Sequence, residues 1–131
     1  MVAAAREAAT PAGDLASTAA QLLRDGKYEA AAYKYRAVLN KGPKGKDAAE
    51  AHYGLGEAEF GQKNYKKAIV QFSKVQEAFA KSTRVPASLL KIAVSFQHLG
   101  MQKESKGFVA ELLERYPKSP EAKKARGKAK E

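Results

Sequence analysis

Three glycines, Gly54, Gly56 and Gly61, lie within eight residues and are followed by a lysine pair, Lys66 and Lys67. Glycine-rich segments of this kind bind phosphate when they follow a strand and open a helix. Here the flanking stretches, AAEAHY and EAEF, favour a helix interior, and the spacing G-x-x-x-x-G-K-[ST] is absent. We therefore interpret Gly56 as a packing residue where two helices cross, and we place the lysine pair on an outer helix face.

The other residues that could do chemistry do not form a recognisable catalytic or metal site. The two histidines, His52 and His98, are far apart in the sequence and have no clustered carboxylates around them. The chain has no cysteine and no G-x-S-x-G motif. An enzyme needs a nucleophile, a base and an orienting group together. We predict a protein that is not an enzyme, with no cofactor, no metal and no small-molecule substrate.

Composition and charge set the class of protein and of partner. The chain has 131 residues, the size of one domain, and 44% of them are apolar. The net charge of +10 favours acidic partners of any kind, but the basic residues are scattered, and only the end, KSPEAKKARGKAKE, is locally dense. We expect nucleic acid to be an unlikely partner. No apolar run approaches the ~20 residues of a membrane span, and the first residues lack the apolar stretch of a secretory signal.

An internal repeat of 37 residues determines the expected fold. Segments that begin at Arg24, Gly61 and His98 align, and matching residue types then share columns. The aligned columns are Ala19/Gly56/Ala93, Gly26/Lys63/Gly100, Ala31/Ala68/Ser105 and Tyr35/Phe72/Val109. Apolar residues recur with helical spacing on both sides of a central break in each unit. Each repeat is therefore predicted to be a pair of helices.

These observations predict an all-α solenoid of three helix pairs. We expect residues 1–13 to be a flexible N-terminal segment or a leftover of cloning, and residues 14–131 to be one domain. The repeats cover about 12–48, 49–85 and 86–118, and a capping helix covers 119–130. Pro86 and Ser119-Pro120 are typical of a first helical turn, and Asp47 with Glu50 three residues later resembles a capping box.

The columns resemble the tetratricopeptide repeat (TPR) family. In that family a small residue, glycine, alanine, an aromatic residue and proline recur in this order. The four columns above are similar to the first four of these, and the column Pro43/Ala80/Pro117 is similar to the proline. Lys63, Ala80, Ser105 and Val109 depart from that pattern. The usual TPR period is about 34 residues. The longer period predicts connections between repeats that are longer by about one helical turn.

A narrower resemblance is to the C-terminal TPR domain of the Tol-Pal system protein family CpoB/YbgF. The similar segments are YGLGEA from Tyr53, PASLLK from Pro86 and YPKSP from Tyr116. The resemblance implies a periplasmic scaffold that links the Tol-Pal system to peptidoglycan synthesis in cell division, with a TolA-like protein or a peptidoglycan synthase as partner. The alternatives are a TPR accessory subunit of outer-membrane lipoprotein assembly, and a basic helical domain that binds nucleic acid or an anionic surface. The first residues, which lack a secretory signal, fit either a cytoplasmic protein or a domain excised from a longer exported chain. We expect this chain to be monomeric.

The same resemblance implies a binding groove, because the first helices of stacked TPR pairs line the concave surface. Seven residues in the groove-facing columns are the predicted partner-binding residues: Leu23, Tyr53, Glu57, Phe60, Leu90, Val94 and Gln97. We expect Glu57 to prefer a partner with Lys or Arg beside an apolar anchor. Tyr53 is expected to contact the partner and to be replaceable without unfolding the domain.

Overall fold

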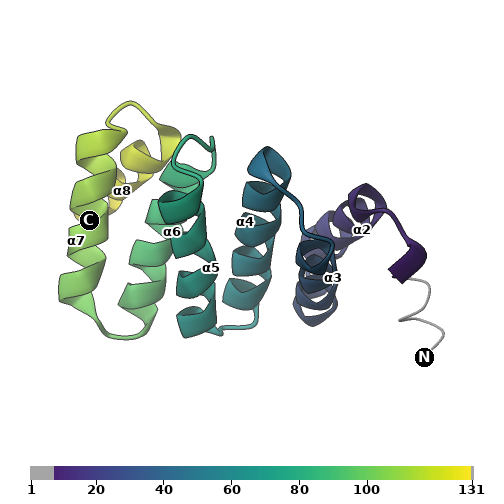
Figure 1. The fold of residues 1–131 in the computed structure, drawn as a ribbon. Coiled ribbons are helices and arrows are strands. Elements are labelled where there is room, and N and C mark those ends of the chain that lie inside the picture. Colours follow the sequence, from purple (N-terminus) through teal and green to yellow (C-terminus); the bar gives the residue numbers. More distant parts are fainter. Residues whose placement is uncertain (1–7, 131) are drawn as a thin grey trace.

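The structure, a computed structural model, describes residues 8–130 and, of residues 128–130, only the backbone. Helices follow one another in pairs along a single row (Figure 1). The first pair is α2 (Ala12–Arg24) and α3 (Tyr28–Asn40), and the second is α4 (Gly45–Gly61) and α5 (Tyr65–Ala78). The third pair is α6 (Val85–His98) and α7 (Gln102–Arg115), followed by α8 (Pro120–Lys130). The predicted all-α solenoid of three helix pairs plus a C-terminal helix is confirmed.

The period of 37 residues is kept at the turn inside each pair. The first helices end at Arg24, Gly61 and His98, and the second helices begin at the equivalent positions of each repeat. The additional length between repeats takes two forms. Helix α4 has 17 residues, whereas α2 has 13 and α6 has 14, and its connection to α3 is short. Between α5 and α6 the loop 79–84 is longer instead.

The turn inside each pair is a Schellman motif, the arrangement in which a residue with left-handed backbone ends a helix. In the first turn the N–H of Lys27 donates to the carbonyl oxygen of Leu22 at 2.9 Å, and the other two turns repeat this bond. The residue with positive φ is Gly26 (76°), Lys63 (64°) and Gly100 (76°) in the three turns. Glycine takes this backbone without cost, whereas the Cβ of a lysine strains it.

We expect Lys63→Gly to raise the free energy of unfolding by about 0.5–1 kcal/mol, because it removes the Cβ from a left-handed backbone position. Urea denaturation followed by circular dichroism measures this. Lys63→Ala is the control, since it removes the charge but keeps the Cβ. If the alanine variant gains as much stability as the glycine variant, then the lysine charge, and not the backbone, is the cause.

Three of the four glycines of α4, Gly54, Gly56 and Gly61, let an aromatic ring lie against the helix backbone. A Cβ on Gly56 would stand 2.7 Å from the ring of Phe72 on α5, and this confirms the predicted helix crossing. A Cβ on Gly54 would stand 2.2 Å from Tyr35, and one on Gly61 would stand 2.4 Å from Tyr28. The glycines are therefore packing residues within a helix, and the interpretation as a phosphate-binding loop does not apply.

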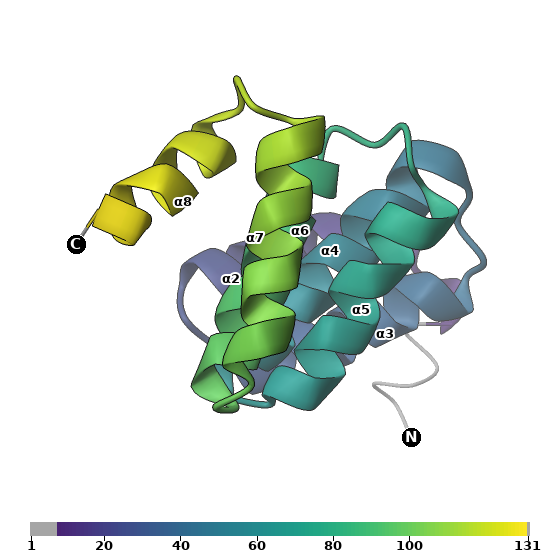
Figure 2. The same ribbon diagram turned by 90° about the vertical axis from the view of Figure 1, so that its left-hand side faces the viewer.

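Helix α8 covers part of the end of the array. Ala122 and Ala125 are buried in one apolar cluster with Leu112 of α7 and Leu89 of α6, and Figure 2, viewed from this end, shows α8 beside α7. The N–H of Ala122 donates to Ser119 Oγ at 3.0 Å, so that Ser119 caps the helix as the sequence indicated. The prediction of a capping helix thus agrees with its contacts.

Two helix starts differ from the expectation. Helix α4 begins at Gly45 with Lys44 at its N-cap, so the capping box predicted at Asp47 is wrong. Gly42 and Gly45 both have positive φ, which turns the chain into the helix earlier. Helix α2 begins at Ala12, so residues 12 and 13 of the expected N-terminal segment are helical, and residues 1–7 lie outside the described part. Pro86 lies in the first turn of α6, as predicted.

Candidate functional site

Four of the seven predicted groove residues, Leu23, Tyr53, Glu57 and Phe60, lie around two adjoining hollows on the inner surface. The central hollow, of about 370 Å³, is lined by residues that include Ala20, Leu23, Tyr35, Glu50, Tyr53, Glu57 and Arg84. The aromatic hollow, of about 480 Å³, is lined by residues that include Leu23, Tyr28, Glu57, Phe60, Lys63, Tyr65, Lys91 and His98. Leu23 and Glu57 border both hollows, which therefore adjoin one another, and the two together are called the groove; its residues come from α2, α4 and α6 among others.

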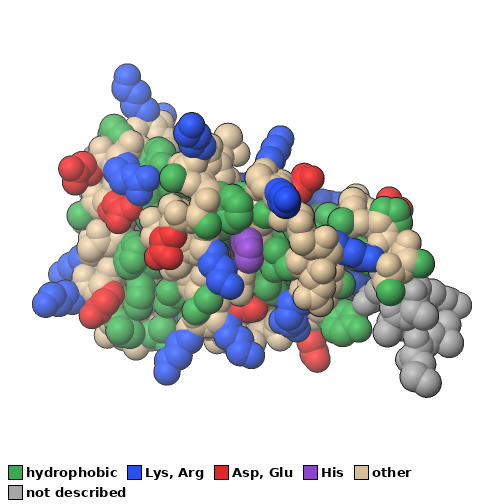
Figure 3. All heavy atoms as spheres, viewed as in Figure 1, with side chains coloured by type: hydrophobic (Ala, Val, Ile, Leu, Met, Phe, Trp, Pro, Cys, Tyr) green, Lys and Arg blue, Asp and Glu red, His purple; other side chains and the backbone are tan. Residues whose placement is uncertain are grey.

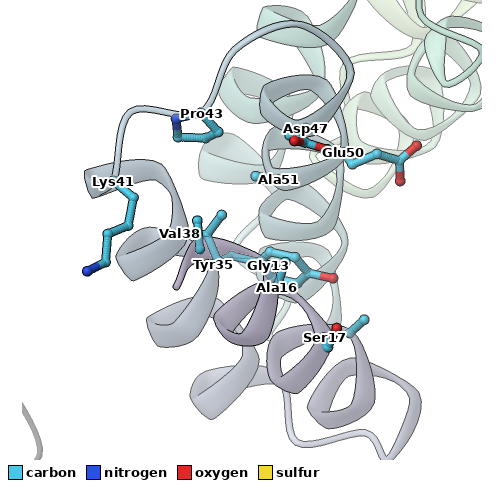
Figure 4. A pocket seen from close by; sticks show the side chains of 12 residues that line it. Gly13, Ala16, Ser17, Tyr35, Val38, Lys41, Pro43, Asp47, Glu50 and Ala51 are labelled. Atoms are coloured by element: carbon cyan, nitrogen blue, oxygen red, sulfur yellow. The ribbon is translucent and has the colours of Figure 1, made fainter. Parts of the chain in front are cut away.

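The groove continues past the central hollow toward the first turns of α2. A further hollow of about 430 Å³ is formed by α2, α3 and α4, and Tyr35 and Glu50 belong to both (Figure 4). Its lining is largely small or apolar, with Ala16, Val38, Pro43 and Ala51 among its residues. Small side chains on α2 thus leave room above the ring of Tyr35 for a bound segment.

Two charged side chains of the central hollow, Glu50 and Arg84, are already paired with one another. Arg84 Nε lies 3.0 Å and 3.2 Å from the two carboxylate oxygens of Glu50, and its guanidinium stands 4.9 Å from the centre of the Tyr53 ring. Burial raises the pKa of Glu57, while the positive charges of Lys91 and Arg84 act against that rise. The rise shows that these charges do not fully offset burial, so the expected preference of Glu57 for a partner Lys or Arg stays a prediction.

Tyr53 is a core residue at the floor of the groove. Its side chain is 7% exposed, and its ring packs against Phe72 with centroids 5.5 Å apart. Burial raises the pKa of its phenol. Truncation of such a ring leaves a cavity and costs several kcal/mol, so the expectation that Tyr53 is replaceable without unfolding does not hold. Leu23 and Phe60, which are half-buried, are the better apolar contacts for a partner.

The other three predicted residues lie elsewhere. Leu90, Val94 and Gln97 line a separate hollow of about 380 Å³ with α7 and Ala125 of α8. The reason is the position of α6, which is the first helix of the last pair. Its groove-facing columns therefore face the end of the row and the capping helix α8. The structure brings Leu23, Tyr53, Glu57 and Phe60 together but does not place these three residues with them.

Arg84 and Lys91 are two of the groove residues that sequence reasoning missed, as are Tyr28, Tyr35, Lys63 and Tyr65. Arg84 immediately precedes α6. It lies in the long connection 79–84, whose path the repeat columns do not predict. Lys91 follows Leu90, a groove-facing column, and its Nζ reaches across to stand 4.4 Å from the centre of the Phe60 ring. The helical period places Lys91 next to the groove columns, and only the length of its side chain brings the ammonium into the groove.

A buried carboxylate lies outside the groove. Glu59 is 4% exposed, its Oε1 is 3.8 Å from Arg36 Nη1, and its Oε2 has no hydrogen-bond partner within the described residues. Burial raises the pKa of Glu59, and the positive charges of Arg36, Lys67 and Lys74 counteract part of that rise. An ionised carboxylate of this kind destabilises the folded state.

Glu59→Gln is expected to raise the free energy of unfolding at neutral pH by roughly 1 kcal/mol, because it removes a buried charge with an unpaired oxygen. The folded protein holds this proton more tightly than the unfolded chain does. Protonated Glu59 therefore contributes stability below the ordinary glutamate pKa. This contribution is lost as pH rises through the raised pKa that Glu59 has in the folded protein. Denaturation between pH 4 and 8 tests this. A gain that is the same at every pH, or as large for the exposed control Glu77→Gln, would contradict it.

Known protein families account for most of the chain. Two family models described as Tetratricopeptide repeat match residues 22–92 and 87–119. A search of curated proteins gave no match. Within residues 8–130, no group of three metal-ligating side chains is found, and none of the helices described is both long and apolar enough to cross a membrane.

Proposed function

Because the chain belongs to the tetratricopeptide repeat family, we propose that its concave groove holds a segment of a partner protein. Domains of this family are generally scaffolds for protein–protein interaction and are typically not catalytic. The observation that carries the proposal is the groove formed by the adjoining central and aromatic hollows, where half-buried Leu23 and Phe60 lie beside Glu57 and Lys91. Apolar side chains supply affinity in such grooves, and polar groups set the register of the bound segment.

For the biological setting, we propose an adaptor of the Tol-Pal envelope system, active in the periplasm, with a TolA-like protein or a peptidoglycan synthase as partner. The support is the similarity of YGLGEA, PASLLK and YPKSP to the CpoB/YbgF family. Two of these segments bear on the groove in the structure. YGLGEA contains Tyr53 and the glycines against which Tyr35 and Phe72 pack, and PASLLK ends at Lys91, beside Phe60.

Calorimetric titration with TolA fragments from the same organism tests this proposal. Leu23→Ser removes an apolar side chain shared by both hollows, and we expect it to weaken binding about tenfold or more. The control, Lys66→Ala with Lys67→Ala, removes two exposed lysines from α5 and should leave the affinity unchanged. Melting curves verify that both variants fold. Loss of binding in the lysine variant with normal binding of Leu23→Ser would contradict groove binding.

A basic domain that binds nucleic acid or an anionic surface is the alternative from another class. Its support is α8, where Lys123, Lys124 and Arg126 are exposed. On the face shown in Figure 3, however, basic side chains are spread out and acidic ones lie among them. Binding through phosphates weakens steeply as salt rises. A steep salt dependence with an oligonucleotide, and none with a TolA fragment, would favour this alternative. A TPR accessory subunit of lipoprotein assembly would bind in the same groove but not to TolA.

A further inference from the structure

The aromatic hollow is lined by rings from four different helices. Tyr65 and His98 stack with centroids 4.5 Å apart and planes 2° from parallel, and Phe60 meets Tyr65 edge-on at 5.3 Å. Tyr28, 38% exposed, lines the same hollow. A volume of about 480 Å³ accommodates a large side chain of a bound segment. Faces and edges of rings are favourable contacts for another aromatic ring.

The charge of this hollow favours an anion. Two ammonium groups, those of Lys63 and Lys91, line it together with one carboxylate, that of Glu57. Lys91 and Arg84 both act on Glu57 and lower its pKa against burial. Lys63, in contrast, is exposed and has no ion pair among residues 8–130. A carboxylate of a bound segment therefore finds an uncompensated positive charge at Lys63.

The backbone of Lys63 is an independent observation. Its φ of 64° is left-handed, and the equivalent residues of the other two turns are glycines with the same conformation. A lysine here strains the fold, and strain of this kind is concentrated at binding and switch sites. In addition, α5 has no acidic residue in its first turn, whereas α3 has Glu29 and α7 has Glu104. The positive end of the α5 dipole is thus left without an acidic neighbour in its own first turn.

We propose that the aromatic hollow binds a partner segment in which an aromatic residue stands next to Asp or Glu. The ring of that residue lies against Tyr28, Tyr65 and His98, and its neighbouring carboxylate pairs with the Lys63 ammonium. The inference rests on the proposed function, because the hollow is one end of the same groove. It gives the partner an acidic residue at Lys63, where the sequence suggested only a basic one near Glu57.

Nuclear magnetic resonance titration with a synthetic peptide, acetyl-Gly-Asp-Phe-Glu-Gly-amide, tests the inference. We expect saturable amide shifts around Gly61, Lys63 and His98. Lys63→Gly should weaken binding by up to about fivefold, the upper end of what an exposed ion pair contributes. Because the same substitution should stabilise the fold, unfolding cannot explain that loss. His98→Ala should also weaken binding, and the control Lys66→Ala, which removes an equal charge from the adjacent helix, should not.

Peptide controls separate the two parts of the site. Replacing Phe by Ala, or Asp and Glu by Asn and Gln, should each weaken binding to the unaltered protein. The inference is overturned if the peptide causes no saturable shift, or if Lys63→Gly binds it as well as the original chain does. If shifts cluster instead at Ala20, Glu50 and Arg84, the inference fails and groove binding stands. If they cluster at Val70 on the exposed face of α5, both fail.

Discussion

Gly56→Leu should lower the free energy of unfolding by about 3 kcal/mol or more, which is a large part of the stability of a domain of this size. The ring of Phe72 is completely buried and leaves no space for even a Cβ on Gly56, which would lie 2.7 Å away. Leucine adds further atoms toward that ring, so α4 and α5 must separate. The separation disrupts the apolar cluster that includes Phe72 and Leu89.

The matched control is the same substitution on α7. Gly107 is an exposed residue inside that helix, and a Cβ there meets no atom within 4 Å. Gly107→Leu should be neutral or stabilising by up to about 1 kcal/mol, because leucine favours helix more than glycine does. Urea denaturation of both variants measures the contrast. Equal stability of the two variants would mean that the helix crossing at Gly56 is not close-packed.

Removal of α8 is the second change with a large expected effect. A chain that ends at Lys118 lacks Ala122 and Ala125, the buried residues of α8 that pack with Leu112. The last repeat of a solenoid then exposes an apolar face, and uncapped arrays aggregate. We expect a lower melting temperature and concentration-dependent aggregation, measured by light scattering.

A point substitution tests the same interface without shortening the chain. Ala122→Glu buries a carboxylate against α6 and α7, whereas Lys123→Glu places the same residue on the exposed face of α8. We expect the first to reproduce the effect of the truncation and the second to leave the melting temperature nearly unchanged. If the truncated chain is as soluble and as stable as the original, α8 contributes nothing to the fold.

The fold was predictable from the sequence because each column records a contact that recurs in every repeat. Ala31 and Ala68 are completely buried, and glycine at two of the three turns indicated where helices end. The roles of Gly54 and Gly61 were not predictable. They depend on Tyr35 and Tyr28 of the preceding pair, and a column does not show which neighbour fills the space that a glycine leaves.

The site was predicted less completely, for physical reasons that differ from residue to residue. Residues of one groove-facing column occupy equivalent positions in the three repeats of the sequence. In the structure their surroundings differ, because the last repeat has no following pair beside it. For this reason Leu90, Val94 and Gln97 face α7 and α8 instead of the groove. Tyr53 is both groove-facing and buried, because a ring is long enough to reach the core. Arg84 comes from a connection, where periodicity carries no information about position.

The central claim is that partners bind on the concave side of the array, and photo-crosslinking from two positions tests it most directly. A photoreactive amino acid replaces Arg24, which is exposed beside the central hollow, or Val70, which is 51% exposed on α5 and borders neither hollow. Both variants are expressed in the organism of origin and irradiated. Groove binding predicts one strong crosslinked partner protein from position 24 and none from position 70. A partner crosslinked from position 70 and absent from position 24 would contradict it.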